Sequence, residues 1–287
     1  MNHPLILIIY FVRGESQNDQ TPFREWFGKI GEIRALLPTV PLLAVTATAS
    51  KKSRNKIKQK LGILGCQEIV SNPDRGNIKL FCRKHTASKP TGEIFEWLIT
   101  EMTELKEAFP STLIFCKSIK DCAAIYSQMK LTIPGMISKI DMFHSCTTEI
   151  KKDKIRTDMN CDNGNIVVLV ATNAAGMGVN YVGVKQVINF GPPQEMDTLL
   201  QHIGRAGRDG SQATHIIIYT ARQLRNCDPE VIAYIKSTTC LRRQLLLPYS
   251  SSPTIEPTHE CCQVKYDNSG LYLYRHSDIK QIYIFRS

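Results

Sequence analysis

The fold of this chain is decided by VATNAAGMGVNYVGVKQVINFGPPQEMDTLLQHIGRAGRDG, residues 170–210. This segment continues the apolar run 166–170, which is β-branched and typical of a parallel strand buried on both faces. The small residues at 171–178 predict a loop whose backbone comes close to a ligand. A second strand at 187–190 and a helix at roughly 195–203 are expected to follow.

The predicted helix ends in the glycine-broken sequence Gly204-Arg205-Ala206-Gly207-Arg208. A guanidinium is a planar, permanently charged group that can neutralise charge on a transferring phosphoryl group. Arg205 and Arg208 are therefore candidates for contact with phosphate. A solvated basic turn is the alternative that these five residues alone leave open.

Two motifs in this segment resemble motifs V and VI of the superfamily-two helicases. They are Ala-Thr-x-Ala-x-Gly-Met-Gly-Val from residue 171 and Gln-x-x-Gly-Arg-x-Gly-Arg from residue 201. Residues 190–210 are similar to the RecQ family in particular, and the resemblance covers about Pro22 to Cys262. It includes a motif III-like Thr46-Ala47-Thr48-Ala49, a motif IV-like run at 113–116, and Phe143-His144-Ser145, which is similar to a Tyr-His-Ala stretch of that family.

The resemblance implies an α/β fold of RecA-like parallel-sheet lobes, with a partial first lobe, a complete second lobe and a degenerate helical zinc-region remnant. The expected divisions are a non-matching tail at 1–21, the end of lobe one at 22–85, lobe two at 86–222, the zinc region at 223–263, and a non-matching tail at 264–287. Local patterns predict further strands at 39–45, 112–116, 165–170 and 215–219, and further helices at 22–37, 50–61, 118–129 and 148–159. The apolar run 4–12 predicts either a strand or sequence foreign to the fold.

The resemblance also implies roles for individual residues. Arg205 and Arg208 would stabilise transition-state charge, and Gln201 would sense the nucleotide. The positions expected to bind the cofactor are Gly176, Gly178 and Asn180, the last of which stands where many relatives carry an acid. The candidates for nucleic-acid contact are Thr172, Thr46, Thr48, His144, Lys52 and Lys56, with Thr46 and Thr48 also expected to couple the lobes. A structural histidine remains the alternative for His144, and a solvated helix face for the lysines.

The composition limits the class of protein. The 287 residues leave room for about two domains, and 43% hydrophobic with 22% charged residues is ordinary for a globular protein. The net charge of +10 favours a polyanionic partner, which the resemblance specifies as single-stranded or forked DNA. Ten cysteines without a regular spacing disfavour a secreted disulfide scaffold, so an intracellular setting is expected, nuclear in a eukaryote. No apolar run reaches the roughly eighteen residues of a membrane span, and no membrane partner is expected.

The cysteines after residue 220 give the zinc prediction. RecQ proteins continue here into a four-cysteine zinc module, and by that spacing Cys240 and Cys262 match ligand positions. His259 stands where another ligand would be, and Lys265 occupies the last ligand position. Zinc prefers four nitrogen or sulfur ligands, so three ligands, or four if Cys261 joins, make an incomplete site.

Two motifs of an ATP-driven motor are missing from the sequence. It contains no Gly-x-x-x-x-Gly-Lys-Ser/Thr and no Asp-Glu-x-His, which would hold ATP phosphates and Mg²⁺. In the family both lie upstream of the match at Phe23, so the chain alone is expected to be inactive. The non-matching tails lead to the hypothesis that both are translated intron of an incomplete gene model or truncated isoform, which transcript reads across 255–287 would test.

The function implied by the resemblance is ATP-dependent DNA unwinding with 3′-to-5′ polarity, in repair, recombination or replication, using ATP and Mg²⁺. The alternative from another class is a non-catalytic nucleic-acid-binding or regulatory fragment, which the missing phosphate loop favours. A dinucleotide-binding oxidoreductase built on Gly176-x-Gly178 is disfavoured because the third glycine and the opening helix are missing.

Overall fold

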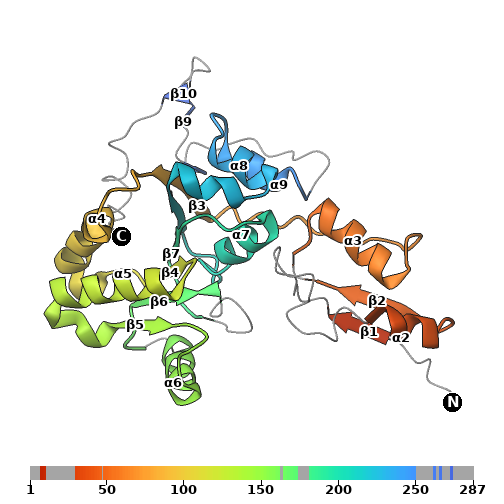
Figure 1. Cartoon of the computed structure of the whole chain (residues 1–287), viewed down its shortest axis with the longest axis horizontal. Helices are drawn as coiled ribbons and strands as arrows, with labels where there is room; N and C mark the ends of the chain where they lie inside the picture. The colour runs from red at the N-terminus through yellow and green to blue at the C-terminus, as the bar shows by residue number, and fades with distance from the viewer. Residues whose placement is uncertain are drawn as a thin grey trace. The chain divides into compact units, whose positions relative to one another are not determined.

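The computed structural model describes residues 7–10, 30–46, 48–161, 164–173, 181–249, 261–262, 265–266 and 272–273 (Figure 1). The predicted site residues Gly176, Gly178, Asn180 and His259 lie outside these ranges. The first half of the predicted helix 22–37 and most of the two tails also lie outside them.

The chain divides into a small unit, residues 1–73 with 248–251, and a large unit, residues 74–247 with 252–287. The division falls earlier than the boundary near residue 85 expected from the sequence. The difference arises from β3 (Ile78–Lys84), which pairs in parallel with β8 (Ala213–Tyr219) and so belongs to the sheet of the large unit.

A six-stranded parallel sheet forms the centre of the large unit, in the order β3-β8-β7-β4-β6-β5 (Figure 1). Its remaining strands are β4 (Thr112–Cys116), β5 (Ile140–Phe143), β6 (Val168–Thr172) and β7 (Gln186–Phe190). These bounds confirm the strands predicted at 112–116, 165–170, 187–190 and 215–219 to within a few residues. β4 pairs with β6 on one side and with β7 on the other. The segment 170–210, which begins in β6 and passes through β7, therefore lies at the middle of the sheet.

Helices connect the strands, as a parallel sheet requires. The connecting helices are α4 (Thr91–Leu105), α5 (Ile119–Thr132), α6 (Glu149–Met159) and α7 (Met196–Ile203), with the short 3-10 helices η1 (Lys106–Ala108) and η2 (Pro134–Lys139). The 3-10 helix η4 (Ala221–Asn226) and the helices α8 (Pro229–Ile235) and α9 (Leu241–Leu246) follow β8. The start of α5 is set locally, since Ser118 Oγ accepts a hydrogen bond from the Asp121 backbone N–H at 3.1 Å. The helices predicted at 118–129, 148–159 and 195–203 are confirmed, whereas α4 is not among the predicted elements.

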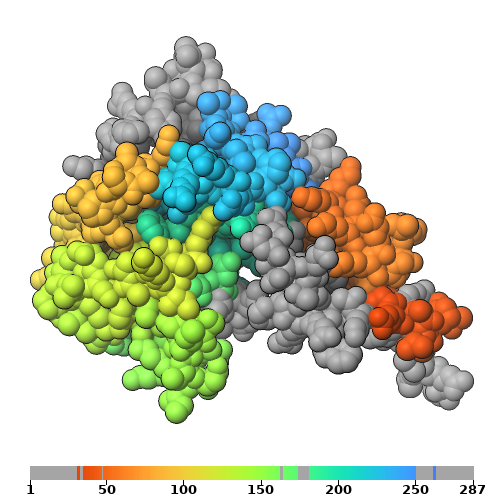
Figure 2. Space-filling view, in the orientation of Figure 1, coloured from red at the N-terminus to blue at the C-terminus, as the bar shows by residue number. Residues whose placement is uncertain are grey.

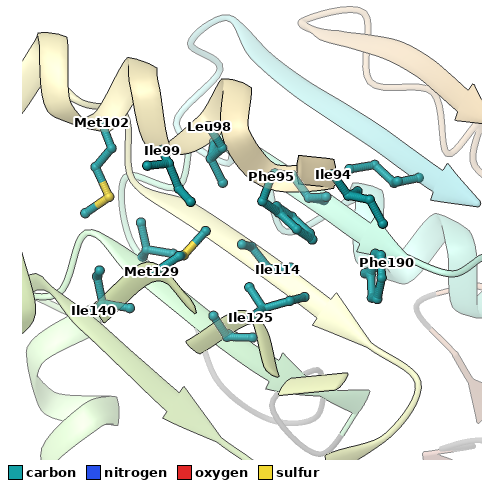
Figure 3. Close-up of a cluster of buried hydrophobic side chains, with 14 of the residues drawn as sticks. Ile94, Phe95, Leu98, Ile99, Met102, Ile114, Ile125, Met129, Ile140 and Phe190 are labelled. Carbon is teal, nitrogen blue, oxygen red and sulfur yellow. The ribbon is translucent and has the colours of Figure 1, made fainter. Parts of the chain in front are cut away.

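Both faces of the sheet are buried. Figure 3 shows Leu98 of α4 and Met129 of α5 directed toward Ile114 of β4, within one apolar cluster. Side chains alternate along a strand, so Phe115 points to the opposite face, where it stacks on His202 of α7 with ring centroids 3.7 Å apart. In the space-filling view, α4 and α5 form a continuous layer in yellow to yellow-green (Figure 2). The β-branched strands are therefore covered on two sides, as their pattern predicted.

The small unit holds two parallel strands, β1 (Leu7–Tyr10) and β2 (Leu42–Val45), with the helices α2 (Ile30–Leu36) and α3 (Lys51–Leu61). The Ser50 hydroxyl caps α3 by accepting from the Ser53 backbone N–H at 3.3 Å, and Gly62, with a φ of 64°, ends it. The helix predicted at 50–61 is confirmed. The strand predicted at 39–45 is shorter, because the Val40 N–H donates to Leu37 O in a turn.

The described residues Cys261 and Cys262 of the C-terminal segment meet the edge of the sheet, where the Leu80 N–H donates to Cys261 O at 3.3 Å. Cys262 forms a single parallel bridge with Leu80 of β3, the edge strand, and β9 (Lys265–Tyr266) pairs antiparallel with β10 (Tyr272–Leu273). Across the described ranges, no helix combines the length and the apolar character needed to cross a bilayer.

Candidate functional site

The arginine loop, residues 204–211, begins where α7 ends. Gly204 closes the helix, since its N–H donates to Leu200 O at 2.9 Å. The loop then turns at Gly207 and Gly210, whose φ angles are 53° and 81°. The structure thus contains the glycine-broken helix end that the sequence predicted, with its two arginines on adjoining turns.

Gly207 is required by both backbone conformation and space. Its positive φ is one that residues with a Cβ adopt rarely. A Cβ built on Gly207 would lie 2.5 Å from Asn77 Nδ2 and 2.7 Å from Ser211 O. The Gly207 N–H also donates to Val184 O at 2.8 Å, which ties the loop to the segment that enters β7. Any larger residue would push the loop away from these partners.

Three guanidinium groups gather around the loop. Burial, and then the charge of Arg208, lower the pKa of Arg205. Burial, and then the charge of Arg75, lower the pKa of Arg208. An arginine remains protonated at neutral pH even so, and the arrangement concentrates positive charge at one place. Such a cluster suits a ligand with several negative oxygens.

The end of the loop is held by an ion pair and short polar contacts. Lys185 Nζ lies 2.9 Å from Asp209 Oδ2, and Asp209 Oδ1 accepts from the Ser211 backbone N–H at 3.1 Å and from its hydroxyl at 2.5 Å. The hydrogen bond from the Ser211 hydroxyl, followed by that from Lys185, lowers the pKa of Asp209. Asp209 therefore stays ionised and balances Lys185 rather than the arginines.

A buried hydrogen-bond chain lies beneath α7. Asn189 of β7 joins His202 of α7, at 2.7 Å from Nδ2 to Nδ1, to His215 of β8, at 2.8 Å from Oδ1 to Nε2. An amide Nδ2 can only donate and an amide Oδ1 can only accept, so His202 Nδ1 is unprotonated and His215 Nε2 carries a proton. Burial lowers the pKa of each histidine to about 3, so both rings are neutral at physiological pH. The helix that carries Gln201 is thereby fixed to the sheet.

Two predicted nucleic-acid residues lie at the carboxyl edge of the sheet. Phe143 of β5 pairs with Ala171 of β6, so His144 and Thr172 lie next to each other in this register at neighbouring strand ends. The His144 N–H donates to Thr147 Oγ1 at 3.0 Å, while its ring Nδ1 is buried without a hydrogen-bond partner among the described residues. Both residues are only partly buried, as a contact surface requires.

The small unit carries the other predicted nucleic-acid residues. Thr46 is exposed, and its hydroxyl donates to Thr48 O at 3.2 Å. Lys52 and Lys56 are exposed on α3. Of the six basic residues of α3, Arg54 and Lys58 lie 2.9 Å and 2.5 Å from the carboxylate of Glu68, and these two contacts lower the pKa of Glu68. Part of the basic face is thus neutralised within the unit.

The cysteine cluster consists of Cys240, Cys261 and Cys262, whose buried sulfur atoms lie within 4.8 Å of one another. Cys240 Sγ is 3.4 Å from Cys261 Sγ, which is 3.6 Å from Cys262 Sγ. Thiolates at about 2.3 Å from a tetrahedral zinc lie roughly 3.8 Å apart, so the cluster fits three zinc ligands. The structure includes Cys261, which the sequence prediction treated only as an optional ligand.

Several residues of the site were missed from the sequence. Arg75 and Asn77 contact the arginine loop although they lie some 130 positions earlier in the chain. The signal available was an arginine and an amide, Arg75 and Asn77, placed directly before the apolar residues that form β3. Asn189 and His215 became neighbours only through the strand order, which the sequence does not display.

Residues 93–210 match the family model described as the helicase conserved C-terminal domain. The mouse protein "Bifunctional 3'-5' exonuclease/ATP-dependent helicase WRN" is 27% identical over 270 residues, which are 84% of this chain and 18% of that protein. "ATP-dependent DNA helicase Q-like 2" of Arabidopsis thaliana is 26% identical over 91% of this chain and 36% of that protein. "Putative ATP-dependent RNA helicase R290" of Acanthamoeba polyphaga mimivirus is 30% identical over 83% of this chain and 44% of that protein. The chain spans less than half the length of each of these relatives.

Solved structures share the fold of this chain. One is S. cerevisiae Dbp5 bound to RNA and ADP BeF3, with a TM-score of 0.58 and 18% identity over 80% of this chain and 57% of that one. Another is the DUF1998 helicase MrfA bound to DNA and AMPPNP, with a TM-score of 0.58 and 16% identity over 80% of this chain and 32% of that one. At this level of identity the likeness concerns the fold alone.

Proposed function

We propose that this chain, which is RecQ-like and has the RecA-like α/β fold of the superfamily-two helicases, contributes the arginine-bearing lobe of an ATP-dependent 3′-to-5′ DNA helicase. The observation that carries the proposal is the arginine loop. It combines two arginines and a glycine that tolerates no side chain, on a helix fixed to the sheet by a buried hydrogen-bond chain. A solvated basic turn would need none of these constraints.

The arginines act on the phosphates of ATP in this proposal. Arg205 and Arg208 neutralise charge that develops on the transferring phosphoryl group, and Gln201 senses whether nucleotide is bound. Gly176, Gly178 and Asn180 are the candidate residues for binding the cofactor, and Gly176 and Gly178 would contact phosphate or the DNA backbone. Mg²⁺ bound with ATP would supply positive charge that offsets the charge of the phosphates.

Nucleic acid would contact both units. Thr172 and His144 at the carboxyl edge of the sheet, and Thr46 and Thr48 in the small unit, are the candidate contacts. Lys52 and Lys56 would neutralise backbone phosphates. We favour single-stranded or forked DNA, although the mimivirus relative is named as an RNA helicase, so binding is best compared on DNA and RNA oligonucleotides of the same sequence.

A non-catalytic role for this polypeptide in isolation is the second candidate. The 287 residues contain neither Gly-x-x-x-x-Gly-Lys-Ser/Thr nor Asp-Glu-x-His, so we infer that the chain alone does not hydrolyse ATP. Its activity would then depend on groups supplied by other polypeptide. The nucleic-acid contacts do not need those groups, so binding would persist without turnover.

Zinc is the metal that the cysteine cluster would hold. Cys240, Cys261 and Cys262 supply three sulfur ligands, and His259 is the candidate for the fourth position. The described cysteines are all free thiols, which agrees with the reducing intracellular setting we propose, nuclear in a eukaryote.

The test grafts a complete first lobe onto residues 22–262 and measures ATP affinity and DNA-stimulated turnover. Arg208→Ala should lower turnover about a thousandfold with little change in ATP affinity. Arg208→Lys should fail nearly as badly, because a point charge does not reproduce the bidentate fork. Arg225→Ala, which removes an exposed arginine of η4, is the matched control. Near-normal turnover of Arg208→Lys, or a loss confined to ATP affinity, would refute the assignment.

A further inference from the structure

Two residues at the start of the large unit, Arg75 and Asn77, donate hydrogen bonds to the arginine loop. Asn77 Nδ2 donates to Gly207 O at 2.8 Å and to Ser211 O at 2.7 Å. Arg75 Nη2 donates to Gly207 O and lies 3.5 Å from Ala206 O. These carbonyl groups belong to the middle and the end of the loop, so one short segment fixes both.

The segment that contains these two residues, 74–77, is itself hydrogen-bonded to a buried arginine. Arg242 of α9 is 4% exposed, and its Nη1 lies 2.6 Å from Asp74 Oδ1 and 2.7 Å from Arg75 O. Its Nη2 donates to Ile78 O at 2.5 Å, where β3 begins. Arg242 thus forms hydrogen bonds at both ends of the segment that carries Arg75 and Asn77. A guanidinium with several donors in one plane is suited to such a task.

The backbone continues the same connection. The Ala213 N–H donates to Asn77 O at 2.9 Å, at the point where the arginine loop enters β8. Asn77 therefore accepts from one end of the loop with its backbone and donates to the loop with its side chain. Each of these bonds joins residues that are far apart in sequence, so none of them forms through local turn geometry.

We propose that Arg75 and Asn77 are positioning residues that hold the arginine loop in one conformation, and that Arg242 holds them in place. Their consequence for turnover rests on the proposed function, whereas their effect on the loop does not. The loop carbonyl groups would otherwise be hydrated, and a loop with two glycines would gain conformational freedom. Arg205 and Arg208 would then no longer be held at fixed places, which transition-state stabilisation requires.

Hydrogen exchange of the full chain, followed by mass spectrometry, tests the proposal. Asn77→Asp keeps the size of the side chain but removes both donated hydrogen bonds, and it places a carboxylate against two carbonyl oxygens. The amides of 204–211 should exchange about tenfold faster or more, with β4 and β6 unchanged. Asn77→Ser, which also loses the amide donor, gives the second measurement if the aspartate variant does not fold.

Arg75 supplies the test by conservative substitution. Arg75→Ala should also speed exchange in the loop, and Arg75→Lys should restore part of the protection, because an ammonium can still donate to one carbonyl. Lys84→Ala, at the other end of β3, is the control and should leave the loop unchanged. Unchanged loop exchange in both Asn77 variants, or equal acceleration throughout the sheet, would overturn the proposal.

The outcome is separable from that of the turnover test above. If loop exchange rises in the Asn77 variants while Arg208→Ala leaves turnover intact, the positioning role stands and the proposed function fails. If Arg208→Ala abolishes turnover while the loop exchanges normally in the Asn77 variants, the reverse holds.

Discussion

The two units of this chain differ in how completely their parallel strands are buried. In the large unit, six strands lie between helices, and the central residues Leu98 and Leu113 are fully inaccessible. Among the described residues of the small unit, two strands pair as a sheet, and Leu43 of β2 is 50% exposed. Parallel sheets are ordinarily covered on both faces. Motif III-like residues are thus carried by a unit whose apolar surface is far less well buried than that behind the arginine loop.

A matched pair of leucine substitutions should show this difference most strongly. Leu98→Ala empties part of the large core and should lower the free energy of unfolding by about 2–5 kcal/mol. Leu43→Ala removes a half-exposed side chain and should change it by less than about 0.5 kcal/mol. Chemical denaturation measures both, with the fluorescence of Trp97 reporting the large unit and far-ultraviolet circular dichroism reporting the whole chain. Equal losses would mean that the small unit has a core of comparable strength.

Acidification should destabilise the large unit selectively. The pKa values of His202 and His215 are about 3 in the fold, below the unfolded value of about 6.5. The unfolded chain therefore binds more protons, so the stabilisation is complete above pH 6.5 and is lost as pH falls toward 3. Between pH 6.5 and 5.5 the loss should be about 1 kcal/mol for each histidine, or about 2 kcal/mol together.

The pH effect has a direct control. A Trp26→Phe background isolates the fluorescence of Trp97, so that denaturation curves report the large unit. His215→Gln should remove about half of the pH dependence while keeping a polar group beside Asn189. The same dependence in the variant would show that the buried chain of three residues is not its source.

The sequence predicted those parts of the fold that depend on local pattern. β4 and β7 are short β-branched runs closed by turn residues, and both were found close to their predicted bounds. The end of α7 was predicted from two glycines, one of which proves to have no room for a side chain. At these positions the structure follows from residues that are close together in the sequence. The apolar runs are buried as strands, and the glycines allow the backbone to turn where the helix ends.

The missed parts depend on tertiary contacts. β3 belongs to the large unit because it pairs with β8, a partner that no pattern within 71–85 indicates. Asn77 contacts Gly207 for the same reason, since β3 and β8 are adjacent and the arginine loop enters β8. Cys261 joins Cys240 because Cys262 bridges to Leu80 and places its neighbour beside α9. Sequence spacing indicates which residues could meet, whereas strand order decides which do.

A buried carboxylate gives a smaller test within α4. Glu101 is 7% exposed, neither carboxylate oxygen accepts a hydrogen bond from the described part of the chain, and burial, then the charge of Glu104, raises its pKa to about 8. Because the folded pKa lies above the unfolded value of about 4.3, stability is lost as pH rises from 4 toward 8. Glu101→Gln should therefore add about 1–2 kcal/mol at pH 8 and little at pH 4.

The neighbouring glutamate is the control for this substitution. Glu104 lies in the same helix but is exposed, so Glu104→Gln should change the free energy of unfolding by less than about 0.5 kcal/mol at either pH. Equal effects of the two substitutions would indicate a general response of α4 to charge rather than the burial of one carboxylate.

The smallest expected effect concerns the basic face of α3. It tests whether the small unit contributes to the affinity for nucleic acid. Lys52, Lys56 and Lys60 are exposed on α3. If the three lysines neutralise phosphates, their joint replacement by alanine should reduce the slope of log affinity against log salt by roughly one for each phosphate that is no longer neutralised. Fluorescence anisotropy with a single-stranded DNA oligonucleotide, over a series of salt concentrations, measures this slope.

A triple substitution in the large unit separates a phosphate track from a general charge effect. Lys151, Lys152 and Lys154 of α6 carry the same total charge, and Lys151 and Lys152 lie 2.8 Å and 2.7 Å from Asp141 and Glu149. This triple alanine variant removes the same formal charge from a different unit, so its slope shows how much of the change follows net charge alone. If both variants flatten it equally, the effect follows net charge and α3 is a solvated helix face. If only the α3 variant does so, the small unit, despite its exposed apolar strand, supplies a defined part of the nucleic-acid surface.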